Sequence, residues 1–309
     1  MPNVRLFIYE KRWSTQVLNI DKITLAIERN NPLQHLLNHI EQQQRADKLP
    51  YRQTAHGAVE SYLYNGVRIE PQRMLNHSHY KYNFDLHYNG VTVGMLQVET
   101  YQYNANKYSY LSIYNECLYN RQWLLYKQIT ERLHLTISHI TRLDIARDTH
   151  TDPTRKYLRI VSDPSNEIII NGKLVKDRNK LLHSPYFISV GSLNNPMKQH
   201  SIYLASDNKT LMARGYCKTD EVDQHSGKQY QLHDDNGKPL YRLEVSISGR
   251  QLKPHDAELF QTDETPMFLR NETPLLQRIE HANQLGKLFN QYMHRLFRYS
   301  RHGEKRQTL

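Results

Sequence analysis

A tyrosine with basic residues on both sides is the clearest candidate for chemistry in this sequence. Residues 210–219 follow the turn signal at 206–208, and as a β-strand they would place Arg214, Tyr216 and Lys218 on one face. A phenol ordinarily keeps its proton up to about pH 10, and neighbouring positive charge favours the phenolate, which can attack phosphorus. The pattern is typical of phosphoryl transfer onto tyrosine. It is also ordinary on a half-solvated strand of a chain with 22 tyrosines.

Carboxylates occur on two further predicted strands. The alternation over 140–148 puts Asp144 and Asp148 on one face, and the strand predicted over 241–248 carries Glu244. Magnesium and manganese ions prefer oxygen ligands, and acidic residues on adjacent strands can supply them. We therefore expect Asp144, Glu244 and Asp148 to hold Mg²⁺ or Mn²⁺ beside the tyrosine.

Short sequence blocks connect these candidates to a known family. The blocks are Thr-Arg-Leu-Asp at 141–144, Gly-Tyr-Cys-Lys-Thr-Asp-Glu at 215–221, Tyr-Arg-Leu-Glu at 241–244 and, more weakly, Ile-Tyr-Leu-Ala-Ser at 202–206. In this order they resemble the rolling-circle replication initiators, of both the plasmid replication initiation factor type and the filamentous-phage gene II type. The weaker block has alanine where the family has glycine. A second departure bears on the metal ligands, because many plasmid members carry an acidic residue where this chain has Cys217.

The resemblance implies a function and a role for each residue. Tyr216 would be the nucleophile that nicks one strand at a replication origin, leaving a 5′ phosphotyrosine and a free 3′ hydroxyl, and later rejoins the strand. Lys218, with Arg214 as a weaker helper, would steady the phenolate or the phosphate. A DNA-binding replication regulator without catalysis and a conjugative relaxase are the two alternatives.

Other side chains compete for the same roles. His77 and His79 lie two apart and would share a face of a strand as metal ligands, although 17 histidines make such a pair common by chance. Asp85 and His87 share a face of another predicted strand and would be either metal ligands or solvated polar positions. Tyr203, in the weaker block, is the rival nucleophile.

Composition narrows the partners and the compartment. The chain of 309 residues has a formal net charge of +10, which favours a polyanion such as nucleic acid. Its two cysteines exclude a disulfide framework, and it has no phosphate-binding loop of the Gly-x-x-x-x-Gly-Lys type. No apolar run is long enough to span a membrane, so we expect a cytoplasmic protein of a bacterial host. The implied partners are double- and single-stranded origin DNA and the host helicase and polymerase, with a homodimer left open.

The predicted elements indicate an α+β fold with an antiparallel β-sheet core, flanking helices and a C-terminal helical segment, as in the rolling-circle nucleases. Strands are expected at 4–9, 80–88, 91–100, 107–119, 140–148, 210–219 and 241–248. Helices are expected from the Asn-Pro pair at 31–32, after Asn120, and from the Thr-Pro pair at 273–274. The Asn-Gly pair at 89–90 predicts a tight hairpin.

These elements suggest three regions. Residues 1–76 form an N-terminal strand and helix region, 77–250 a catalytic nicking-joining domain with an insertion at about 149–200, and 251–309 a linker and basic C-terminal helix. Basic side chains spread over the last two regions are the expected DNA contacts. They are Arg142, Arg242, Lys173, Lys176, Arg178, Arg295 and Arg298.

Overall fold

The computed structural model describes the chain in several stretches. They are residues 17–46, 61–72, 80–99, 108–177, 201–226, 228, 238–252, 279 and 282–308, apart from residues 121, 123, 207–208, 302–303 and 305. The chain forms two compact units, of which the first comprises residues 1–21, 143–254 and 276–309 and the second residues 22–142 and 255–275. Strands β1 (Val17–Glu28) and β7 (Ile137–Thr149) contribute residues to both units.

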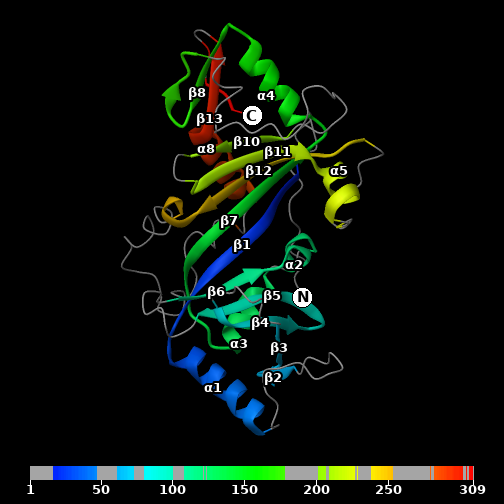
Figure 1. The fold of residues 1–309 in the computed structure, drawn as a ribbon, viewed down its shortest axis with the longest axis vertical. Helices are drawn as coiled ribbons and strands as arrows, with labels where there is room; N and C mark the ends of the chain where they lie inside the picture. Colours follow the sequence, from blue (N-terminus) through cyan, green and yellow to red (C-terminus); the bar gives the residue numbers. More distant parts are fainter. Residues whose placement is uncertain are drawn as a thin grey trace. The chain divides into compact units, whose positions relative to one another are not determined.

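The sheet of the first unit contains the candidate residues. Its strands are neighbours in the order β10 (Ile202–Ala205), β11 (Leu211–Cys217), β12 (Tyr241–Ser248), β7 and β1 (Figure 1). β11 pairs antiparallel with both β10 and β12. The edge strand β10 is therefore the neighbour of the tyrosine strand, and β12 separates that strand from the acidic strand β7.

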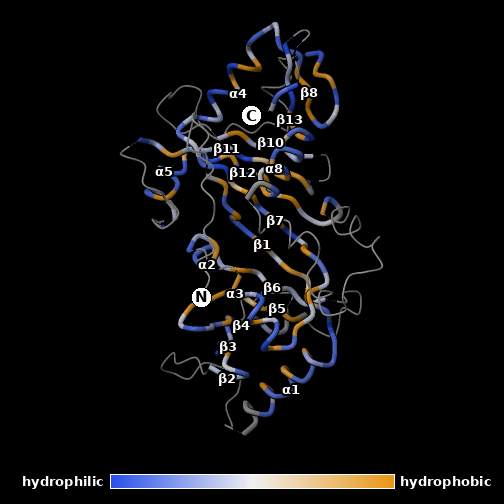
Figure 2. The backbone as a smooth tube through the Cα atoms, turned by 180° about the vertical axis from the view of Figure 1, so that it is seen from behind, coloured by the Kyte–Doolittle hydropathy of each residue, from blue (hydrophilic) through white to orange (hydrophobic). Residues whose placement is uncertain are grey.

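Two helices cover one face of this sheet. They are α4 (Pro153–Ser162) and α8 (Ala282–Leu296), and both contact β11 and β12. The covered face is apolar, as alternation requires, with Leu243, Val245 and Ile247 all buried on β12. Along both helices hydrophobic stretches alternate with hydrophilic ones, as expected of helices that pack with one side (Figure 2). The opposite face carries the polar residues of the same strands.

The start of α4 is fixed close to the tyrosine strand. Asp152 caps the helix by accepting hydrogen bonds from the backbone N–H groups of Thr154 (2.8 Å) and Arg155 (3.2 Å), and Pro153 follows at the first helical position. A Cβ atom at Gly215 would lie 3.0 Å from Pro153 Cγ and 2.9 Å from the Ile202 side chain. Glycine at this position therefore lets α4 pack directly behind Tyr216.

The first unit also contains shorter elements. The strand β11 leads into α5 (Lys218–Glu221) and a π-helical turn (Val222–Ser226), and β12 is followed by a 3₁₀ turn (Gly249–Gln251). A second, three-stranded sheet has the order β13 (Phe297–Arg301), β8 (Asn166–Ile170) and β9 (Lys173–Leu174).

In its described residues the second unit is an antiparallel meander with three helices. From β1 its strand order continues through β6 (Tyr108–Ile113), β5 (Val91–Glu99), β4 (Tyr80–Tyr88), β3 (Val67–Pro71) and β2 (Tyr62–Tyr64). The helices are α1 (Asn31–Ala46), α2 (Asn115–Tyr119) and α3 (Leu125–Arg132). Asn89 and Gly90, with φ of 51° and 77°, form the predicted tight turn between β4 and β5.

The α+β class with an antiparallel sheet and flanking helices is confirmed. The strands over 80–88 and 241–248 have the predicted bounds. The single strand expected over 107–119 is wrong, because β6 ends at Ile113 and α2 begins at Asn115. The strand expected over 4–9 lies outside the described residues. None of the described helices is long and apolar enough to cross a membrane.

Candidate active site

Tyr216 lies on the polar face of the first unit with a cation on each side. The guanidinium carbon of Arg214 is 5.0 Å from the centre of the Tyr216 ring, and Nζ of Lys218 is 5.9 Å from it. These distances allow cation–π contacts from both side chains. The predicted grouping of one phenol with two cations is therefore present, although Lys218 belongs to α5 and not to the strand, which ends at Cys217.

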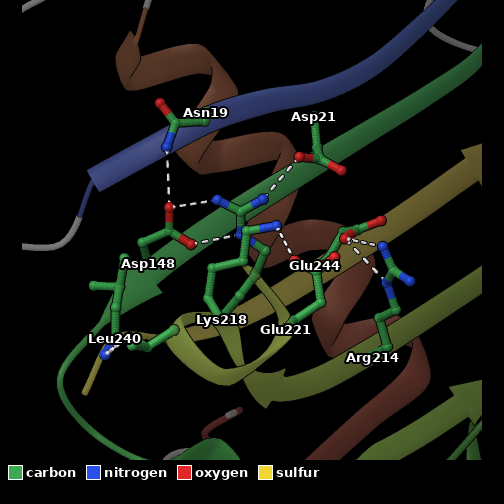
Figure 3. A network of polar contacts seen from close by, with 10 residues as sticks. Asn19, Asp21, Asp148, Arg214, Lys218, Glu221, Leu240 and Glu244 are labelled. Atoms are coloured by element: carbon green, nitrogen blue, oxygen red, sulfur yellow. Dashed lines mark hydrogen bonds and ion pairs between the residues drawn. The ribbon is translucent and has the colours of Figure 1, made fainter. Parts of the chain in front are cut away.

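Lys218 is held by its backbone and by an acidic neighbour. The backbone N–H groups of Lys218 (2.7 Å) and Thr219 (3.2 Å) donate to the carbonyl of Leu240, and the Leu240 N–H donates to Thr219 Oγ1 (2.9 Å). These bonds turn the chain from β11 into α5 and bury the Lys218 side chain. Its Nζ donates to Glu221 Oε2 at 2.6 Å (Figure 3).

The Lys218–Glu221 pair shifts the pKa of both groups. Burial and the nearby Arg242 lower the pKa of Lys218, and Glu221 opposes that change. Burial tends to raise the pKa of Glu221, but the hydrogen bond and charge of Lys218 lower it on balance. The pair thus keeps the Glu221 carboxylate ionised, while the Lys218 ammonium is buried in a position that disfavours its charged form.

Arg242 is the centre of a buried ion network. Its Nε and one terminal nitrogen donate to the two carboxylate oxygens of Asp148, both at 2.7 Å, and its other terminal nitrogen donates to Asp21 at 2.7 Å. Asn19 also donates to Asp148, at 3.2 Å (Figure 3). The Arg242 side chain is fully buried. Such a two-pronged pair fixes β12 against β7 and β1.

Two sequence-based assignments need correction at this network. Arg242 was expected to contact DNA, but a fully buried guanidinium bound to two carboxylates cannot reach a phosphate. Asp148 was expected as a metal ligand, yet both of its oxygens accept hydrogen bonds from Arg242. The physical reason is the same for both residues. Each side chain can be buried because the opposite charge of the other offsets its loss of solvation.

Glu244 lies on β12, the strand next to the tyrosine strand, and Asp144 lies one strand further away, on β7. Glu244 is directly opposite Arg214 in the strand register and accepts from its Nε (3.0 Å) and a terminal nitrogen (2.8 Å). Asp144 accepts from the Ser246 hydroxyl at 2.6 Å. Burial raises the pKa of Glu244, and the charges of Asp21 and Asp144 raise it further, against the opposing effect of Arg214.

The acid–base state of Tyr216 differs from the expectation. Flanking cations were expected to favour the phenolate, but the pKa of Tyr216 is raised. Burial is the largest cause; Arg242 and Arg214 lower the pKa, while Glu244 and Asp21 raise it. Tyr216 is a protonated phenol at neutral pH, so an attack on phosphorus has to include removal of its proton.

The carboxylates do not fit a complete metal site as they stand. Among the residues that the structure describes, no group of three or more histidine, cysteine or acidic side chains is placed to hold an ion. Asp148 is bound by Arg242, and Glu244 is bound by Arg214. Dependence on Mg²⁺ or Mn²⁺ stays a prediction.

The rival site residues are divided between the two units. Tyr203 lies on β10 directly opposite Arg214, in the same sheet as Tyr216. In the second unit Asp85 accepts hydrogen bonds from Gln72 (2.6 Å) and from the Tyr114 hydroxyl, and His87 is 3.2 Å from Glu70. Asp85 and His87 are thus paired with other protein side chains, which fits polar positions on a sheet. His77 and His79 lie outside the described residues.

The remaining residues predicted to contact DNA lie on different elements of the described chain and belong to both units. Lys173 on β9 and Lys176 just after it are exposed, and Arg178 lies outside the described residues. Arg295 is exposed on α8, with its guanidinium 5.5 Å from the Tyr292 ring centre, and Arg298 is half-buried on β13. Arg142 is half-buried and belongs to the second unit.

Sequence reasoning missed three residues of the site. Asp21 and Asn19 lie on β1, a strand that was not predicted. Glu221 is the last residue of the 215–221 block, and no role was predicted for it. The alternation of Ile23, Leu25 and Ile27 is a signal for that strand, and it places Asp21 on the same face two residues earlier. For Glu221 the signal is its spacing of three from Lys218 within a short helix.

Comparisons with known proteins give one finding. No family model matches this chain, and no curated protein matches it in sequence. Among solved structures it is similar to a rolling circle replication initiator protein from Geobacillus stearothermophilus, with a TM-score of 0.47 and 10% identity over 94% of this chain and 88% of the other. A likeness of that size does not assign a function to this chain.

Proposed function

We propose that this protein is a DNA nicking and joining enzyme that initiates rolling-circle replication of a plasmid or filamentous phage. The observation that carries the proposal is Tyr216, whose ring is contacted by Arg214 and Lys218 on the polar face of the sheet. A net charge of +10 supports a polyanionic substrate. A tyrosine flanked by two cations is suited to hold a phosphodiester while its hydroxyl attacks.

The proposed step is an exchange of one phosphodiester for another. The Tyr216 oxygen bonds to the scissile phosphorus, and the bond from phosphorus to the 3′ oxygen breaks. The phenol proton is removed and a proton ends on the departing 3′ oxygen, so the step consumes no water and no nucleotide. The product is a 5′ phosphotyrosine with a free 3′ hydroxyl, which a polymerase can extend. The reverse attack by a 3′ hydroxyl rejoins the strand.

Arg214 and Lys218 would act on the charge of this step. Both lie beside the phenol ring, and Arg214 is 44% exposed, so its guanidinium is accessible to a phosphate. A fixed cation at a developing negative charge typically contributes about 100- to 1000-fold in rate. Lys218 is buried and protected from water, which strengthens its electrostatic effect.

The raised pKa of Tyr216 predicts a rate that increases with pH. Below that pKa the phenolate fraction rises about tenfold per pH unit, so nicking should accelerate from pH 7 to pH 9 by at most that factor per unit. The lowered pKa of Lys218 predicts a decline at higher pH, when its charge is lost. Initial nicking rates from pH 7 to pH 9 measure the rise, and rates at higher pH measure the decline. A rate that is flat from pH 7 to pH 9 would contradict the assignment.

Glu221 is predicted to act through Lys218. Replacing it with glutamine removes the charge that supports the ammonium, so the pKa of Lys218 should fall further and the alkaline decline should move to lower pH. The pKa of Glu221 is lowered in the folded state, so its ionised form stabilises the fold. It contributes roughly 1–2 kcal/mol to the free energy of unfolding at pH 7. This contribution is lost progressively as the pH falls below the ordinary glutamate value of 4.5.

The Glu221→Gln variant is compared with wild type in two measurements. Urea unfolding should show a larger difference from wild type at pH 7 than at pH 3, and the pH–rate profile should show the shifted alkaline limb. Asp223→Asn is the control, because Asp223 is an exposed acid in the adjoining π-helical turn. An unmoved alkaline limb in Glu221→Gln would remove Glu221 from the proposal.

A DNA-binding regulator without catalysis is the second candidate. It is favoured by the protonated state of Tyr216 and by the pairing of Glu244 with Arg214 and of Asp148 with Arg242. A regulator needs the basic surface and does not need the phenol. The two candidates therefore differ in a single assay of strand cleavage.

The deciding experiment uses the full chain and a supercoiled circle that carries the origin of its own replicon. Open circles with protein attached to the 5′ end are expected with Mn²⁺ present, and a circle without the origin serves as the control. A parallel reaction with EDTA tests the predicted dependence on Mg²⁺ or Mn²⁺. Binding of the origin without any cleavage in either reaction would support the regulator instead.

A further inference from the structure

Two large apolar side chains are exposed on the strand of Tyr216 and on the edge strand next to it. Tyr203 on β10 is 39% exposed and Met212 on β11 is 37% exposed. Among the described residues only two other large hydrophobic side chains reach such exposure, Leu63 and Leu174. Burying Tyr203 and Met212 would be favourable, so their exposure side by side indicates a surface that binds something.

The strand register puts both side chains on the face that carries Tyr216. Tyr203 is directly opposite Arg214, and Ala205 is opposite Met212. Side chains directly opposite each other in an antiparallel pair point to the same face, and diagonal neighbours are within reach of an aromatic ring. Tyr203 therefore neighbours Arg214 directly and Met212 diagonally, and Arg214 in turn lies over Tyr216.

The group at this edge combines flat, apolar and cationic surfaces. Arg214 is bound to Glu244 through Nε and one terminal nitrogen, and its side chain remains 44% exposed. β10 is the edge strand of the sheet, so no further strand covers this side of Tyr203 in the described part of the chain. A ligand can therefore extend from Tyr216 across Arg214 to Tyr203 and beyond the edge.

We propose that Tyr203, Met212 and Arg214 form a stacking platform for unpaired bases of single-stranded DNA next to the phosphate that Tyr216 attacks. The inference deepens the proposed function and rests on it for the position of the phosphate. Single-stranded DNA presents the flat apolar faces of its bases, which match an aromatic ring and a thioether. It also has a negatively charged backbone, which matches a guanidinium. Paired bases hide these faces inside the duplex, so the platform selects single strands.

The platform assigns Tyr203 a role for its ring and none for its hydroxyl. Tyr203→Phe should therefore bind a single-stranded oligonucleotide as wild type does. Tyr203→Leu, which keeps an apolar side chain but loses the ring, should bind it about 5- to 100-fold more weakly, the range expected for loss of stacking on one base. Because Tyr203 is exposed on an edge strand, neither change should unfold the chain.

The test is fluorescence anisotropy with three labelled probes of equal length: a single-stranded oligonucleotide from the origin, its duplex, and an abasic single strand. Tyr203→Leu should lose affinity for the first probe alone, since the other two offer no free base. Leu174→Ala is the control variant, because Leu174 is 54% exposed and lies on β9, outside the sheet that carries Tyr216. Its binding to all three probes should equal that of wild type.

Several results would overturn the platform. Unchanged binding of the single strand by Tyr203→Leu would do so, and it would leave the proposed function standing if wild type nicks the origin. An equal loss on the abasic strand would show that the effect is not stacking, and a loss in Tyr203→Phe would show that the hydroxyl is needed. If Tyr203→Leu loses affinity for the single strand alone and wild type does not nick the origin, the platform is supported and the proposed nicking activity is rejected.

Discussion

Replacing Arg242 with methionine is expected to lower the free energy of unfolding by about 3–5 kcal/mol. The guanidinium is fully buried, with two hydrogen bonds to Asp148 and one to Asp21. Without it, two carboxylates remain in the interior of the sheet without the cation that faces them, which is the most costly way to break a buried ion pair. Urea unfolding followed by circular dichroism measures the change.

Arg155→Met is the matched control for this prediction. Arg155 also pairs with an aspartate, Asp152, at 3.4 Å, but its side chain is 86% exposed. Exposed ion pairs contribute about 1 kcal/mol or less, so this variant should unfold close to wild type. Equal stability of Arg242→Met and Arg155→Met would contradict the buried network described here.

Replacing Tyr216 with phenylalanine is expected to reduce origin nicking by at least about 1000-fold, because removing the nucleophile removes the covalent route. The phenyl ring keeps its contacts with Arg214 and Lys218, so binding of origin DNA should change little. Nicking of a supercoiled circle and binding of the same origin are measured on one preparation. This pairing separates loss of chemistry from loss of folding.

Tyr241→Phe is the control for the tyrosine prediction. Tyr241 lies on the neighbouring strand, opposite Cys217 in the register, and has no part in the proposed step. It should nick as wild type does. Full nicking activity in Tyr216→Phe would place the nucleophile elsewhere, and Tyr203→Phe would then be tested in the same assay.

The local features of the fold were predictable because they are written in neighbouring residues. The alternation over 241–248 and the Asn-Gly turn at 89–90 define a strand and a hairpin without knowledge of any partner. The same alternation predicted that Arg214 and Tyr216 share a face, and the ring contact bears this out. Lys218 also contacts the ring, but it is positioned by the first turn of α5 and not by the strand.

The ion network was not predictable because its partners are far apart in the sequence. Arg242 bonds to residues 94 and 221 positions away, and the more distant of them, Asp21, lies on a strand that was not recognised. An arginine in a strand of a basic chain was therefore interpreted as a DNA contact, whereas burial makes it a structural ion partner. Only the three-dimensional neighbours of such a side chain decide between these roles.

The pKa of Tyr216 was misjudged for a related reason. Charges flanking the phenol in sequence could be counted, and they favour the phenolate. Desolvation depends on everything packed around the ring, and here it outweighs the cations. In the proposed step, removal of the phenol proton therefore carries a larger energetic cost than it does for an exposed tyrosine.

The most direct test of the proposed chemistry is to locate the covalent bond. Wild-type protein is incubated with an origin oligonucleotide, the adduct is digested with protease and nuclease, and the modified peptide is sequenced by mass spectrometry. We expect a nucleotide attached through its 5′ phosphate to Tyr216. A nucleotide on Tyr203 or on any other residue, or cleaved DNA without an adduct, would contradict it.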